Sequence, residues 1–219
     1  MVEGNCPNSV SLSDEVSNTI KERILKGEYH IGEKLKENQI AYELKVSRTP
    51  IREALKQLEK EGLVESIPNR GSFVLGLTRR DVEDIYAVRA AVEVLAADWA
   101  VSRITDEELN SLREVFDLME FYSEKQNSEK VLELNKEFHQ IIYHASGSRF
   151  LSQLLKSYQE YVEETRKATV YCSENLPLIL EEHRNILEAI CMRNGQLAKN
   201  RLSIHLANSQ KRAELSLKI

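Results

Sequence analysis

Hydrophobic residues in the first third of the chain follow a helical spacing that glycine and turn residues interrupt. Leu12, Val16, Ile20 and Ile24 are four positions apart and end before Gly27, and Ser11 and Ser13 are candidate caps at the start of this helix. Ser47 can cap a later helix that Gly62 ends. Alternating residues then predict two short strands around a turn at 68–71. We therefore expect three helices, beginning at 12, 37 and 47, and a hairpin of strands 63–66 and 72–75.

The rest of the chain contains very few residues that interrupt helices. After residue 76 the only glycines and prolines are Gly147, Gly195 and Pro177, which is typical of long helices with few turns. Short connections favour an antiparallel bundle. Its helices are expected at about 79–102, 105–125, 128–145, 148–171, 177–193 and 196–216. We predict a mainly α protein with domains at 1–76 and 77–219, in which 1–10 is a flexible tail.

The third predicted helix has one apolar face and one basic face. Ile51, Ala54, Leu55 and Leu58 commit one side to a core, whereas Arg48, Arg52 and Lys56 recur every four residues on the other. Such a ridge suits a major groove, where arginine reads guanine while hydroxyls near the helix start, as on Ser47 and Thr49, bind phosphate. With Arg70 at the hairpin tip, the unit is predicted to be a winged helix-turn-helix. The alternative is a solvated basic face on a structural helix.

Composition narrows the class of protein to which the chain can belong. The 219 residues are 42% hydrophobic and 30% charged, which is typical of a globular protein. There is no apolar run of the ~18–20 residues that a membrane helix needs, and no secretory signal pattern. Three cysteines without a CxxC pair indicate a reduced, cytoplasmic compartment and exclude a zinc ribbon.

The net charge of −5 argues against nucleic-acid binding if it is taken alone. Residues 1–76 carry 11 basic and 12 acidic side chains, so even the predicted DNA-binding part is not basic overall. The arrangement of charge is what favours DNA, because the arginines gather on one ridge and the wing. An acidic protein of this kind is expected to bind non-specific DNA weakly.

The N-terminal part contains two continuous motifs, Val46-Ser47-Arg48-Thr49-Pro50-Ile51-Arg52-Glu53-Ala54-Leu55 and the wing Asn69-Arg70-Gly71-Ser72-Phe73-Val74. With these motifs it closely resembles the DNA-binding domain of GntR-family bacterial transcription regulators. The resemblance implies that Arg48, Thr49 and Arg52 contact operator DNA and that residues around Arg70 reach the minor groove or backbone. Asn38 stands where many relatives have arginine.

The helical part contains an arginine and three histidines on faces that are otherwise apolar. Arg89 lies on the apolar stripe of its helix, and a buried guanidinium needs an anion: either Glu93, one turn on, or a ligand carboxylate. His139, His183 and His205 lie on or beside inward faces of three different predicted helices. Each alone is more often a packing residue, but together the imidazoles can converge on a metal ion.

Four segments of the helical part occur in a characteristic order: Tyr86 to Glu93, Asn135 to His139, Glu182 to Ile190, and His205-Leu206. In these segments the chain is similar to the FCD ligand-binding domain of the FadR/VanR branch of the same family. The resemblance implies a divalent metal ion of the zinc or nickel type on Asn135, His139, His183 and His205, with Arg89 holding a small organic acid. An asparagine, rather than an aspartate, occupies the first ligand position.

Together these features predict a cytoplasmic, homodimeric, metabolite-responsive transcription regulator that binds double-stranded palindromic operator DNA, as a repressor in the commoner case. Its partners would be the operator and a small carboxylate metabolite, with no membrane. One alternative is a metalloregulator that senses the ion itself. Another, less favoured, is a metal-dependent hydrolase; no nucleophile or general base accompanies the histidines at a motif spacing, so we predict no enzyme and no catalytic residues.

Overall fold

The computed structural model describes residues 11–76, 78–170 and 175–217. The expected N-terminal tail, Cys6 and Cys172 lie outside these ranges. The chain divides into two compact units, Met1–Leu77 and Thr78–Ile219. The fold is mainly α with a small N-terminal sheet, as predicted.

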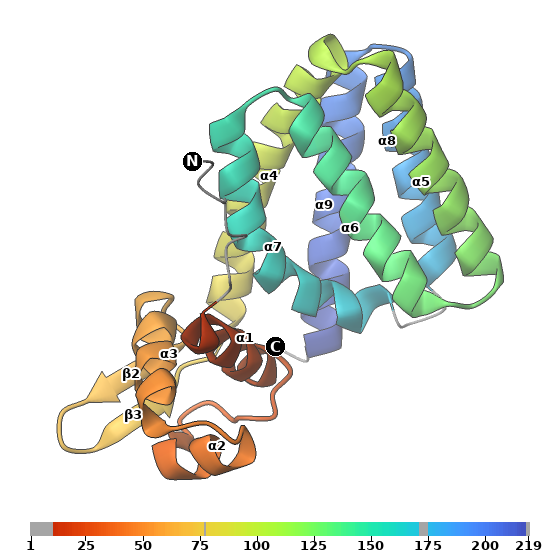
Figure 1. Ribbon diagram of the computed structural model, residues 1–219. Helices are drawn as coiled ribbons and strands as arrows, with labels where there is room; N and C mark the ends of the chain where they lie inside the picture. Colours follow the sequence, from red (N-terminus) through yellow and green to blue (C-terminus); the bar gives the residue numbers. More distant parts are fainter. Residues whose placement is uncertain (1–10, 77, 171–174, 218–219) are drawn as a thin grey trace, which may run out of the picture. The chain divides into compact units, whose positions relative to one another are not determined.

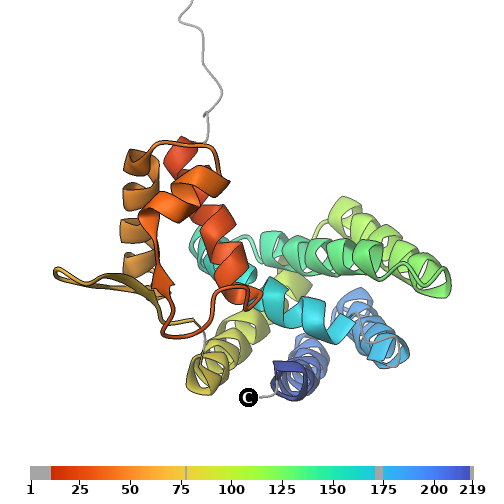
Figure 2. The same ribbon diagram turned by 90° about the horizontal axis from the view of Figure 1, so that it is seen from below.

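The first unit contains the predicted three helices and hairpin, together with one short strand that the sequence pattern does not reveal. Its elements are α1 (Leu12–Leu25), β1 (Lys34–Leu35), α2 (Glu37–Glu43), α3 (Arg48–Lys60), β2 (Val64–Ile67) and β3 (Gly71–Val74). The sheet order is β1-β3-β2, with both pairs antiparallel. Strand β1 is only two residues long, too short for an alternating pattern to predict. Figure 2 shows the β2–β3 hairpin projecting from the three helices as a wing.

The turn between α2 and α3 sets the position of the exposed face of α3. Lys45 adopts φ +56°, and Gly62 adopts φ +75° after the last turn of α3. The predicted side-chain cap is wrong: Ser47 occupies the N-cap position, but its hydroxyl makes no cap hydrogen bond. Helix α3 is held by its apolar face instead. The buried residues on that face are Pro50, Ile51, Ala54, Leu55 and Leu58.

The second unit has six helices in its described part, each within a few residues of its predicted range. They are α4 (Arg79–Arg103), α5 (Asp106–Glu124), α6 (Ser128–Ala145), α7 (Arg149–Val170), α8 (Leu176–Cys191) and α9 (Gly195–Leu217). The predicted capping box at Thr105 and Glu108 is present, and Thr78 forms another with Asp81. These caps satisfy backbone N–H groups that would otherwise be unpaired at the helix starts.

The helices of the second unit enclose one main apolar core. Helices α5, α6, α8 and α9 lie side by side in Figure 1, and α4 packs along α9. Helix α7 packs against α4, α6 and α9 and covers one side of the bundle. None of the described helices is long and apolar enough to cross a membrane.

Candidate DNA-reading face and buried histidine site

The basic face of α3 is exposed over its whole length. Ser47, Arg48, Thr49, Arg52 and Lys56 are all exposed, while the opposite face is buried in the first unit. Arg70 is exposed next to the hairpin turn, where its guanidinium lies 5.6 Å from the centre of the Phe73 ring. Within the first unit, all six residues that the sequence predicted to contact DNA are therefore exposed on the surface.

A glutamate that the sequence analysis missed holds two of these arginines. Oε2 of Glu37 accepts hydrogen bonds from Arg48 Nη2 at 3.0 Å and from Arg52 Nε at 2.8 Å. Burial alone would raise the pKa of Glu37, but the hydrogen bonds from the two arginines outweigh it and lower that pKa. One carboxylate oxygen thus joins the two guanidinium groups. Glu37 lies on α2, so only the packing of α2 on α3 creates the contact, and no sequence spacing signals it.

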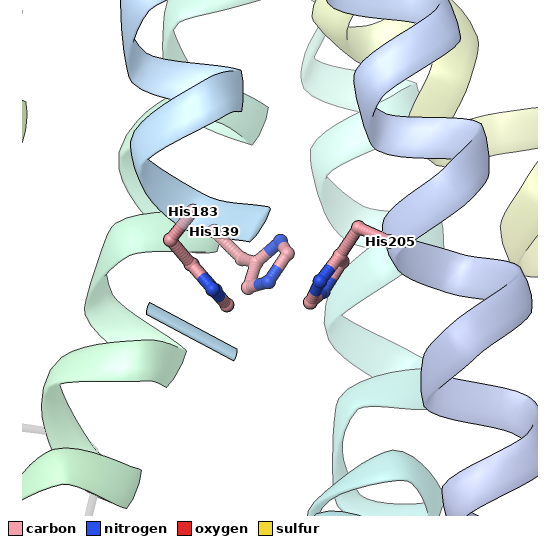
Figure 3. A group of neighbouring side chains, drawn as sticks. All are labelled: His139, His183 and His205. Atoms are coloured by element: carbon pink, nitrogen blue, oxygen red, sulfur yellow. The ribbon is translucent and has the colours of Figure 1, made fainter. Parts of the chain in front are cut away.

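The three predicted histidines converge in the interior of the second unit. His139 comes from α6, His183 from α8 and His205 from α9, and each is at most 3% exposed. One ring nitrogen from each lies within 4.8 Å of the others. Figure 3 shows the rings turned toward one another. A cluster of buried imidazoles from separate helices is a donor set that suits a transition-metal ion.

The hydrogen bonds of two rings define which nitrogen each offers. Nδ1 of His183 lies 2.7 Å from the carbonyl oxygen of Ile179, and Nδ1 of His205 lies 2.8 Å from Oε2 of Glu182. Both partners only accept, so each Nδ1 donates, and Nε2 of the neutral ring keeps its lone pair. Nε2 of His183 faces the side-chain oxygen of Asn135 at 2.8 Å. Both atoms then carry lone pairs, and two such atoms at this distance suit binding to one cation. These ligand atoms therefore fit a metal ion.

Glu182 is a second functional candidate that the sequence analysis missed. Besides His205, its carboxylate accepts hydrogen bonds from Asn208 Nδ2 at 2.8 Å and from Arg212 Nη1 and Nη2 at 2.9 and 2.7 Å. Burial opposes ionisation, but the hydrogen bonds from His205 and Arg212 lower the pKa of Glu182 to about 2. A carboxylate behind a ligating histidine orients the ring and fixes its tautomer. The one sign of Glu182 in the sequence was its place directly before the predicted ligand His183.

Arg89 forms the ion pair that the sequence offered as one of two explanations. Its Nε donates to Glu93 Oε1 at 2.5 Å, and the other oxygen of Glu93 lies 3.6 Å from Nδ1 of His139. Burial alone would lower the pKa of Arg89, but Glu93 and the nearby Tyr86 and Tyr143 raise it, so the guanidinium stays charged. Among the described residues, neither Nη1 nor Nη2 has a hydrogen-bond partner, although both are buried. The pair with Glu93 thus uses only one of the three nitrogens.

The two units define a class of protein. An exposed basic helix with a wing is a DNA-binding element, and a buried cluster of imidazoles in a helical unit is a set of groups that can bind a ligand. A chain that carries both is typical of a one-component transcription regulator.

The comparisons with known proteins identify the family. Residues 12–74 match the model of bacterial regulatory proteins of the gntR family, and residues 84–208 match the FCD domain. The chain therefore belongs to the GntR family of bacterial transcription regulators and carries an FCD domain; it is a regulator and not an enzyme.

Relatives and solved structures agree with this assignment. The chain is 32% identical over 190 residues to the HTH-type transcriptional regulator YdhC of Bacillus subtilis (strain 168), covering 86% of this chain and 84% of that protein. It is 34% identical over 167 residues to the Nta operon transcriptional regulator of Aminobacter aminovorans, covering 75% and 78%. The structure of Escherichia coli McbR/YncC has the same fold, with a TM-score of 0.74, 22% identity, and coverage of 95% and 100%.

Proposed function

We propose that this protein is a metabolite-responsive repressor that binds palindromic operator DNA as a homodimer and senses a small organic acid at a metal site in its FCD domain. The observation that carries the proposal is the convergence of His139, His183 and His205, with Nε2 of two of the rings directed inward by their hydrogen bonds. The expected compartment is the cytoplasm.

The DNA-binding half of the proposal rests on the exposed ridge of α3. Arg48 and Arg52 would contact base edges, Ser47, Thr49 and Lys56 would contact phosphates, and Arg70 would reach the neighbouring backbone or minor groove. The ion pairs with Glu37 support this assignment, because they hold both guanidinium groups over one surface. Two copies related by a twofold axis would read two half-sites.

The sensing half rests on the donor set and on Arg89. Asn135 and the three histidines would hold a divalent ion of the zinc or nickel type, which when bound supplies a Lewis acid that can take a carboxylate oxygen. Nη1 and Nη2 of Arg89 would donate to the same carboxylate, because arginine binds carboxylates bidentately. An acid that binds one conformation of the bundle more tightly than another would shift the protein between DNA-binding states.

The metal site can be tested with a matched pair of histidine variants. We expect wild-type protein to contain about one divalent ion per chain, and His183→Ala to lose it together with the response of DNA binding to organic acids. His144→Ala is the control for metal content, because His144 is an exposed histidine of the same unit, with 84% of its side chain accessible. Elemental analysis and gel shifts would measure both. A metal-free wild type, or a His183→Ala protein that keeps its metal, would contradict the assignment. DNA release by the metal alone would support a metalloregulator instead.

The reading helix is tested separately. Arg52→Ala should lower operator affinity by ~1–3 kcal/mol and relax sequence preference. Lys60→Ala, at the exposed C-terminal end of the same helix, should leave both nearly unchanged. Equal affinities for the two variants would remove Arg52 from the DNA contact.

A further inference from the structure

One polar residue interrupts the apolar inward stripe of α7. The buried positions Leu151, Leu155, Gln159 and Val162 follow helical spacing, and Gln159 is 8% exposed. A buried amide costs free energy unless its groups are hydrogen-bonded. Its oxygen accepts from Gln140 Nε2 at 3.0 Å, but its Nε2 is buried and has no hydrogen-bond partner in the described part of the chain.

The contacts between α6 and α7 show at which level of the bundle Gln159 lies. Lys136 pairs with Glu163 at 2.8 Å, and Gln140 bonds to Gln159 at 3.0 Å, so later residues of α6 meet earlier residues of α7. The two helices are therefore antiparallel. Gln159 lies level with the turn of α6 that carries Gln140 and its neighbour, His139.

Helix α4 brings Arg89 to the same level. Its Val92 and Ala96 pack in one cluster with Leu151 and Leu155 of α7. Arg89 precedes Val92 by about one turn, and Gln159 follows Leu155 by one turn. Helices α4 and α7 pack against each other and run in opposite directions (Figure 1), so the turns that carry Arg89 and Gln159 lie at the same end of this cluster.

A cavity reaches Gln140, the residue that bonds to Gln159. It has a volume of about 550 Å³, lies between the C-terminal half of α6 and the first turns of α7, and is lined partly by Gln140 and Tyr143. Tyr143 also contacts His139, with ring centres 6.1 Å apart. Arg149 and Lys156 line the same cavity, and cationic walls raise the local concentration of anions.

We infer that Gln159 is a specificity residue of the effector site, and that the effector is a small acid with a second oxygen acceptor near its carboxylate, such as a hydroxyl, keto or second carboxyl group. Nη1 and Nη2 of Arg89 donate to the carboxylate, and Nε2 of Gln159 donates to the second oxygen. Gln140 holds the amide in the orientation that presents this donor. The inference rests on the proposed function, because it extends the acid site at Arg89.

The experiment compares acids that differ only in the second oxygen. Propanoate, 2-hydroxypropanoate, 2-oxopropanoate, butanoate and butanedioate are titrated into metal-loaded full-length protein by calorimetry and thermal shift. The variants are Gln159→Leu and Gln159→Met, two apolar side chains of similar size. Gln196→Leu is the control, since Gln196 is exposed on α9 of the same unit and is not among the residues that line this cavity. Circular dichroism and the melting temperature without ligand establish that each variant is folded.

We expect wild type and Gln196→Leu to bind the better oxygen-bearing acids about 3- to 10-fold more tightly than their parent acids. In both Gln159 variants this ratio should fall close to one, while the parent acids keep their affinity. A ratio preserved in the folded Gln159 variants, or a wild type that binds all five acids equally, would overturn the inference and leave the acid site standing. If no acid in the panel binds wild type, the proposed function fails and this inference fails with it.

Discussion

Replacing Glu182 with glutamine removes the charge from a carboxylate that joins α8 to α9. The carboxylate accepts four hydrogen bonds, from His205, Asn208 and both Nη atoms of Arg212, at 2.7–2.9 Å. A glutamine keeps one acceptor oxygen and turns an NH₂ group toward the remaining donors, so about half of the bonds are lost.

Structure sets the size of the effect. A hydrogen bond to a charged group contributes ~1.5–3 kcal/mol, and the side chains of Glu182 and Arg212 are only 13% and 12% exposed. Because some solvent still reaches them, we expect Glu182→Gln to lower the free energy of unfolding by about 3 kcal/mol rather than by the full sum. For a chain of this size that is a fall of roughly 6–12 °C in melting temperature.

Urea denaturation and calorimetry of chelator-treated protein measure this effect without any contribution from metal. Glu181→Gln is the matched control, because Glu181 is the preceding residue of α8 and its side chain is 65% exposed; it should cost less than about 1 kcal/mol. If the two variants are equally stable, Glu182 does not join the helices as described.

The same substitution should weaken metal binding. Without the carboxylate, Nδ1 of His205 loses the acceptor that keeps Nε2 directed inward, and loss of such a partner typically reduces metal affinity about 10- to 100-fold. Competition with a chromophoric chelator measures the affinity, and nitrogen chemical shifts of the imidazole report its tautomer. An unchanged tautomer with unchanged affinity would refute the reasoning.

Three further predictions concern the helix starts and the reading face. Glu37→Gln should change the free energy of unfolding by less than about 1 kcal/mol, because the paired arginines are more than half exposed; a larger loss in urea denaturation would contradict this. Thr105→Ala should cost about 1 kcal/mol by removing a capping box, whereas Ser47→Ala should cost a few tenths, since its hydroxyl makes no cap bond. The backbone N–H of Thr105, with help from a neighbouring histidine and against partial burial, lowers the pKa of Glu108. Its stabilisation is therefore present above the ordinary glutamate range and lost as the pH falls below it, so the stability difference between wild type and Glu108→Gln should shrink on acidification.

The sequence pattern predicted the helices well because each helix start and stop is a local event. The capping box of Thr105 and the left-handed glycine after α3 act within a few residues, so composition and spacing reveal them. The pattern failed where the physical cause was not local. Strand β1 exists only because β3 offers a free edge, and Ser47 is a suitable cap residue whose hydroxyl does not bond to the helix start.

The candidate site divides in the same way. Helical spacing placed Arg89 and the three histidines on inward faces, and family resemblance suggested what they hold. Neither could show that Nε2 of His183 and His205 is the nitrogen directed inward, since that depends on the carbonyl of Ile179 and on Glu182.

Residue order alone specifies which face of each helix is apolar, roughly where each helix begins and ends, and which polar residues lie on apolar faces. These properties follow from residue spacing of 3.6 per turn and from backbone capping. Which of those polar groups meet depends on how the helices pack. Glu37 lies 15 residues from Arg52, Gln140 lies 19 from Gln159, and Glu182 lies 30 from Arg212. Contacts over such separations arise from helix packing, which depends on the whole core and leaves no periodic trace in the chain.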